Sequence, residues 1–157
     1  MHPFIRTRKR QWSRAPLDIE CEVAVEAERF RARLKQISEG GLLLQSNEKL
    51  PARPFVVSFM LPGGGLLRVA AESRYQNQYG YGCQFTKITP ELRAQIDAFL
   101  KRTKKLYSDI QFGMATQRPV AQLAPLLRQA GLDGVTEPKE LKRRVSDAMD
   151  LLLSAGR

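Results

Sequence analysis

Two arginines, Arg10 and Arg14, lie four positions apart in the first 14 residues, a segment with no acidic side chain. Arg6, Arg8 and Lys9 add further cations to this segment, which we call the arm. A guanidinium group presents a planar fork of donors that fits a phosphate or a guanine edge with paired hydrogen bonds. In an extended or irregular arm, two such groups can close on one anion from two sides. The arm therefore predicts a site for a phosphorylated ligand.

A second polar group follows at Gln36, Ser38, Gly40 and Gly41. An amide, a hydroxyl two residues later and two glycines at a strand exit are typical of a turn. Such a turn can present both donors and acceptors to a base. The arm and the turn together are the candidate binding site.

Alternating apolar and polar residues predict the strands that flank these groups. Apolar residues recur at every second position from 19 to 25 in segment 18–26 and from 30 to 34 in segment 30–37, which is the period of a half-buried strand. The outward residues of the first segment are acidic and those of the second are basic, so a hairpin would place opposite charges across from each other. Further strands are expected at 42–45, 55–61, 66–75 and 81–88. Six short strands with turn signals between them predict a small antiparallel barrel.

The pattern changes to helical at Thr89, where an N-cap hydroxyl is followed by Pro90 and Glu91. Further helices are expected at 119–130 and 138–154. We therefore divide the chain into the basic arm (1–14), the barrel with its following helix (15–105) and a helical extension (106–157).

Composition narrows the classes of function. The formal net charge of +10 implies an anionic partner. No apolar run approaches the roughly 18 residues that span a membrane, and no apolar segment follows the early charges as in a signal peptide. We therefore expect a cytoplasmic protein. The single histidine, His2, leaves no set of residues for a catalytic triad or a metal site, so we expect neither an enzyme nor a bound metal or cofactor. Cys21 and Cys83 are expected to be reduced core residues.

The two motifs resemble those of the PilZ domain family, which is marked by an Arg-x-x-x-Arg arm and a later Asp/Asn-x-Ser-x-x-Gly turn. Arg10 and Arg14 match the first motif. Ser38 and Gly41 match the second, with Gln36 in the Asp/Asn position. The segment 82–85, Gly-Cys-Gln-Phe, is similar to the Gly-x-x-Phe ending of the family's last strand. The resemblance covers about residues 6–105 and implies a six-stranded antiparallel barrel.

The family's ligand is the bacterial second messenger cyclic di-GMP (c-di-GMP), so the resemblance implies a non-catalytic bacterial receptor. By resemblance, the two arginines would contact the phosphates and the guanines, and Lys9 would add charge. Gln36 and Ser38 would bond a guanine edge. Glutamine keeps an acceptor and two donors, but its extra methylene moves them by about 1.5 Å from the family's position. The residues expected at the ligand are Lys9, Arg10, Arg14, Gln36, Ser38 and Gly41.

The resemblance also suggests an output. Ligand phosphates would neutralise the arm and draw it across the barrel, creating a new surface. The helices after Thr89 could bind a protein partner or self-associate through the apolar stripe 141–152, or they could simply cap the barrel and one another.

Two other interpretations remain. The chain could be a PilZ-like interaction module that does not bind c-di-GMP. It could also be a small nucleic-acid-binding barrel, with Arg31, Arg33 and Lys35 on the phosphate backbone. The second is disfavoured, because Phe30 and Leu34 alternate onto the opposite face and leave no aromatic platform beside the cations.

Overall fold

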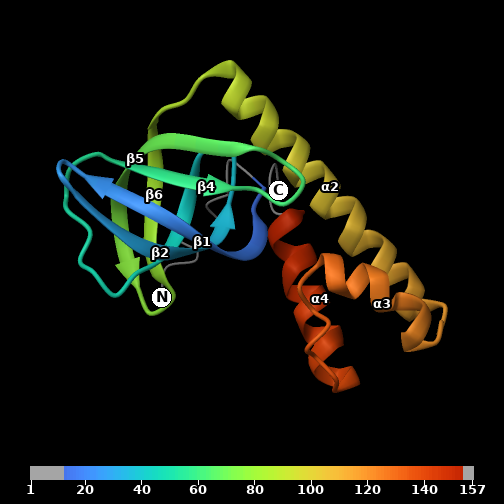
Figure 1. The fold of residues 1–157 in the computed structure, drawn as a ribbon. Helices are drawn as coiled ribbons and strands as arrows, with labels where there is room; N and C mark the ends of the chain where they lie inside the picture. The colour runs from blue at the N-terminus through green and yellow to red at the C-terminus, as the bar shows by residue number, and fades with distance from the viewer. Residues whose placement is uncertain (1–12, 154–157) are drawn as a thin grey trace, which may run out of the picture.

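The computed structural model describes residues 13–153. Six strands form a closed antiparallel barrel, and three helices follow it and extend to one side (Figure 1). The order around the barrel is β1-β2-β3-β6-β5-β4, closed by pairing of β4 with β1. This confirms the predicted fold class, an antiparallel six-stranded barrel with a C-terminal helical extension. The strands are β1 (Ala15–Val25), β2 (Glu28–Ile37), β3 (Gly41–Gln45), β4 (Phe55–Met60), β5 (Leu66–Asn77) and β6 (Gly80–Lys87).

The first two strands form the predicted hairpin. Glu22 lies opposite Arg31 and Glu20 opposite Arg33. A bulge between Leu34 and Gln36 shifts the alternation of β2 by one residue, so that both Leu34 and Ile37 are buried. The simple period of two therefore fails at the end of β2, and the shift leaves Gln36 outside the core.

The barrel interior is filled by inward side chains from every strand, among them Val23, Leu44 and Val57, none of which is exposed. Cys21 and Cys83 belong to this core and are not joined in a disulfide. Burial raises the pKa of the Cys21 thiol to about 11 and that of the Cys83 thiol to about 12. Both thiols therefore stay protonated at neutral pH, as expected of structural cysteines.

The helices are α2 (Pro90–Ala115), α3 (Val120–Gln129) and α4 (Pro138–Leu152). The predicted start of α2 is confirmed, since Thr89 caps the helix by accepting the N–H of Leu92 at 3.1 Å. The helix is continuous through residue 105, where we placed the boundary of the extension. Within residues 13–153, no helix is both long and apolar enough to cross a membrane.

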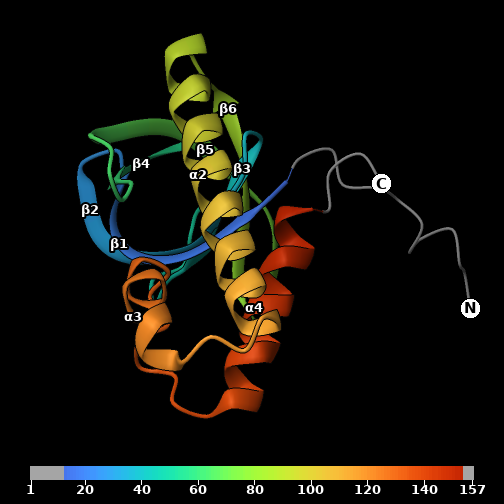
Figure 2. The same cartoon turned by 90° about the vertical axis from the view of Figure 1, so that its right-hand side faces the viewer.

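Both α3 and α4 pack against α2, and α4 also reaches β1 (Figure 2). The apolar stripe of α4 is buried in these contacts, and its residues join the same core cluster as the barrel interior. That face of α4 is therefore covered by α2 and β1, except where Leu141 and Val145 line the space between α3 and α4. The buried residues are Leu141, Val145, Ala148, Met149 and Leu152.

Candidate functional site

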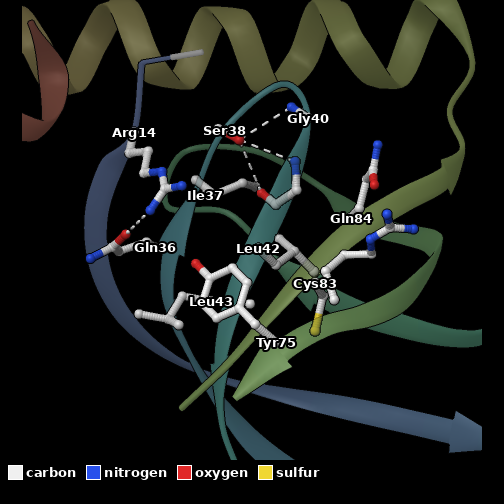
Figure 3. Close-up of a pocket in the computed structure, with 13 residues that line it drawn as sticks. Arg14, Gln36, Ile37, Ser38, Gly40, Leu42, Leu43, Tyr75, Cys83 and Gln84 are labelled. Carbon is white, nitrogen blue, oxygen red and sulfur yellow. Dashed lines mark hydrogen bonds between the residues drawn. The ribbon is translucent and has the colours of Figure 1, made fainter. Parts of the chain in front are cut away.

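A pocket of about 230 Å³ lies where the start of β1, the end of β2 and the start of β3 face β5 and β6 (Figure 3). Four of the predicted site residues line it: Arg14, Gln36, Ser38 and Gly41. The other two, Lys9 and Arg10, lie outside the described residues. The arm and the turn therefore meet in one cavity, as far as the structure describes them.

The β1–β2 pairing explains this meeting. Ala15 lies opposite Ile37 in the antiparallel register. The residue before β1 and the residue after β2 are consequently neighbours, which brings Arg14 beside Ser38. The side chain of Arg14 turns to Gln36, whose Oε1 accepts from Nη1 at 3.5 Å (Figure 3). This bond is long and weak, so a stronger acceptor can draw the guanidinium away.

Ser38 organises the turn. Its Oγ accepts the N–H of Gly40 at 3.2 Å and of Gly41 at 3.1 Å, and it donates to the carbonyl of Gly41 at 3.4 Å (Figure 3). A hydroxyl has one donor and two acceptor sites, so these three bonds use its full capacity. The side chain is also buried, at 8% exposure. In this structure Ser38 therefore shapes the pocket from within the turn.

Gly41 is required by the close approach of β6. A Cβ there would lie 3.1 Å from the carbonyl carbon of Cys83 and 3.3 Å from the Cα of Gln84, and it would overlap the Cys83 oxygen. The contact is with backbone, so a side chain at this position would force the two strands apart. The glycine of the turn thus keeps β3 and β6 together beneath the pocket.

The far side of the pocket comes from β5 and β6. A bulge in β5 between Ser73 and Tyr75 leaves Arg74 as the extra residue opposite β6, and bulges re-aim side chains in this way. Tyr75 lies opposite Gly82, and its ring covers that glycine, because a Cβ there would meet Cε1 at 2.6 Å. The tyrosine remains 46% exposed. It therefore offers an open aromatic surface at the pocket.

Arg74, Tyr75 and Gln84 were not predicted as site residues, although all three line the pocket and Gln84 lies in the family-like segment 82–85. Gln84 projects from β6 (Figure 3). Arg74 is held by an ion pair with Glu72 at 3.1 Å. The lining contains two arginines and no acidic residue. Electrostatically, the pocket suits an anion, and its ring and amides suit a base.

The site shows little that could perform catalysis. Among the described residues, no group of three or more His, Cys, Asp or Glu side chains could hold a metal ion. The Cys83 thiol lines the pocket, but its raised pKa removes it as a nucleophile at neutral pH.

Comparison with known proteins places this geometry in a family. A family model described as the PilZ domain matches residues 8–102, more than half of the chain. The chain belongs to the PilZ domain family. No curated protein sequence matches it.

Solved PilZ structures share the fold. The PilZ domain of YcgR from Escherichia coli with c-di-GMP has a TM-score of 0.51 and 15% identity, covering 71% of this chain and 100% of that chain. YcgR in complex with c-di-GMP gives 0.55 and 17%, with 71% and 51% covered. The inhibitor of motility of Bacillus subtilis (MotI/DgrA) gives 0.51 and 15%, with 60% and 51% covered. The matched part spans about half of the last two proteins, and at these identities the likeness is one of fold.

Proposed function

We propose that this protein is a c-di-GMP receptor of the PilZ type that acts without catalysis. The observation that carries the proposal is the pocket itself. Arg14 and Gln36, Ser38 and Gly41 come from two motifs separated by a hairpin, and all four line one cavity with no acidic side chain. Membership of the PilZ family and the two YcgR structures with c-di-GMP support the choice of ligand.

Each group has a distinct proposed role. Arg14 leaves its weak bond with Gln36 and pairs with a ligand phosphate or a guanine edge. Tyr75, flat on Gly82, stacks on a guanine, an interaction worth about 1–3 kcal/mol per base. Arg74 adds positive charge from the opposite side. Ser38 acts indirectly, by holding the turn that shapes the pocket.

The size of the pocket suggests how the arm takes part. Its volume of about 230 Å³ is below the roughly 300–1,000 Å³ of ordinary ligand sites. A dinucleotide would therefore extend beyond it, over the surface next to Arg14. The preceding residues, with Lys9 and Arg10 among them, would cover that part of the ligand. Ordering of the arm by the ligand is the proposed switch.

Isothermal titration calorimetry with c-di-GMP tests the proposal. The wild type should bind, and Arg14→Ala should weaken binding by roughly ten- to hundredfold, because a bond to a charged group is worth about 1.5–3 kcal/mol. Arg68→Ala is the matched control. This arginine is exposed on β5 and outside the pocket, so its loss removes the same charge and should leave affinity within about twofold.

The outcomes separate the interpretations. An absence of heat with the wild type would mean a PilZ barrel that does not bind the dinucleotide. Equal losses in the two variants would mean general attraction to net charge, as in a nucleic-acid-binding barrel. A mixed-sequence oligonucleotide that competes with c-di-GMP would point the same way.

The route of output is also proposed. The backbone N–H of Arg14 donates to the carbonyl of Leu151 in α4 at 3.0 Å, and α4 packs against β1. Movement of the arm on binding would therefore be felt at the end of α4. Hydrogen exchange with and without c-di-GMP should show altered protection of the last turn of α4. Protection that stays unchanged while the nucleotide binds would contradict this route and leave the receptor proposal intact.

A further inference from the structure

A second and larger cavity, of about 860 Å³, lies away from the pocket, among the three helices. Both α3 and α4 pack against α2, but they make little contact with each other. Figure 2 shows them flanking the C-terminal half of α2. Residues 123–128 of α3 and 138–146 of α4 line the opposing walls. We call this space the α3–α4 cleft.

The floor of the cleft is apolar and its walls are long. Side chains from all three helices form the floor, and each wall extends over about two helical turns, or roughly 10 Å. A groove of this shape fits the apolar face of an additional helix, whose anchors recur at i, i+3, i+4 and i+7. The floor residues are Met114, Leu123, Leu127, Leu141 and Val145.

The rim of the cleft carries more basic than acidic side chains. Arg118, Arg128 and Lys142 stand around it, against a single acid, Asp133. None of the three cations forms an ion pair with a described residue, and Arg118 lies over an aromatic ring of α2 instead. The outer face of α4 is different, because Arg143 pairs there with two carboxylates of its own helix. Three cations without an ion pair to a described residue therefore stand beside the apolar floor.

Charge selects among the possible occupants. The residues of this chain before the described part carry Arg6, Arg8, Lys9 and Arg10 and no acid, so the rim would repel them. Two copies meeting through this cleft would oppose basic rim to basic rim. An acidic segment is attracted.

We propose that the α3–α4 cleft binds an acidic amphipathic helix of a partner protein. Apolar residues on one face of the helix fill the floor, and Asp or Glu residues on its flanks pair with the three rim cations. The inference does not depend on c-di-GMP, and it assigns the helical extension a protein-docking role that the barrel pocket does not require.

The test uses three labelled peptides of about 18 residues with the full-length chain, read by fluorescence anisotropy in the absence of nucleotide. The first has Leu at i, i+3, i+4 and i+7 and Glu on its flanks. The second replaces each Glu by Lys, and the third scrambles the first. The first should bind at least tenfold more tightly than the others. Failure of the first peptide to bind, or equal binding of all three, overturns the proposal.

Variants locate the site. Arg128→Glu combined with Lys142→Glu should weaken binding of the first peptide more than tenfold. Arg68→Glu combined with Lys104→Glu is the matched control: it reverses the same charge at two exposed positions outside the cleft and should change binding less than twofold. Ala124→Trp fills the cleft without removing a floor residue and should also abolish binding. Circular dichroism checks that each variant is folded.

Two results would assign the cleft to another occupant and refute the proposal. Light scattering could show self-association that the double reversal removes, which would make a second copy the occupant. An oligonucleotide could displace the acidic peptide, which would mean that the rim serves a nucleic acid.

Discussion

Gly41→Ala should destabilise the barrel by about 1–3.5 kcal/mol, through one steric conflict. The added Cβ would meet the backbone of β6 at 3.1 and 3.3 Å and overlap the Cys83 oxygen, whereas carbon atoms rest at about 3.5–4.0 Å. The strands must therefore separate by about 1 Å. That movement lengthens the bond from the Phe85 N–H to the Gly40 carbonyl, now 3.0 Å, beyond hydrogen-bond range.

The magnitude follows from two contributions. A lost backbone hydrogen bond costs about 1 kcal/mol, and overpacking adds about 1–3 kcal/mol. Gly→Ala also restricts the unfolded chain, which offsets about 0.4–1 kcal/mol. Gly65→Ala isolates this last effect, because a Cβ at Gly65 meets nothing within 4 Å. The free energy of unfolding of Gly65→Ala should equal that of the wild type or be slightly larger.

Urea unfolding followed by circular dichroism measures the difference. With a slope of about 2 kcal/mol per molar, Gly41→Ala should lower the midpoint by about 0.5–2 M with an unchanged slope. Unfolding free energies of the two variants within about 0.5 kcal/mol of each other would refute the reasoning. The turn glycine would then serve some purpose other than the approach of β3 to β6.

Gly82→Ala should weaken c-di-GMP binding by roughly tenfold or more at little cost in stability. The new methyl would displace the exposed Tyr75 ring that is proposed to stack on a base. Unchanged affinity in calorimetry would show that the ring is not part of the site. The Cys21 and Cys83 thiols should react with a disulfide reagent such as DTNB only on unfolding, since burial raises their pKa values to about 11 and about 12; rapid labelling of the native protein would contradict this. Burial tends to raise the pKa of Asp18, but hydrogen bonds from two basic residues of β2 outweigh it and hold the pKa below the ordinary 3.8. Asp18→Asn should therefore be less stable than the wild type near neutral pH, and the difference should disappear as the pH falls through the folded-state pKa; a gap in urea midpoints that persists in strong acid would refute the assignment.

Much of the fold could be predicted because its determinants are local in the sequence. Alternation located the first two strands, turn signals bounded the other four, and the acidic and basic faces of β1 and β2 indicated their hairpin. The helix start at Thr89 was equally local, since the cap, Pro90 and the early acid are adjacent. The bulge at the end of β2 was not predicted, because it depends on how Leu34 and Ile37 both reach one core.

The candidate site, too, could be predicted only in part from the sequence. Arg14 and the Ser38–Gly41 turn could be predicted as a pair, since they flank a single hairpin and the antiparallel register makes them neighbours. Lys9 and Arg10 lie outside the described residues, so their part in the site stays a prediction. The role expected for Ser38 at a guanine edge is untested, and its hydroxyl is already fully bonded within the turn.

By itself, the sequence determined a basic arm, a Ser-Gly turn and the hairpin that joins them, because all three are contiguous in the chain. Only the tertiary structure decided that Arg74, Tyr75 and Gln84 complete the pocket. They come from strands far along the chain, and closure of the barrel brings β6 against β3. A bulge in β5 then sets which side chains face the site. The α3–α4 cleft was also decided by the tertiary structure, because it forms only where α3 and α4 both pack on α2 with little contact between them.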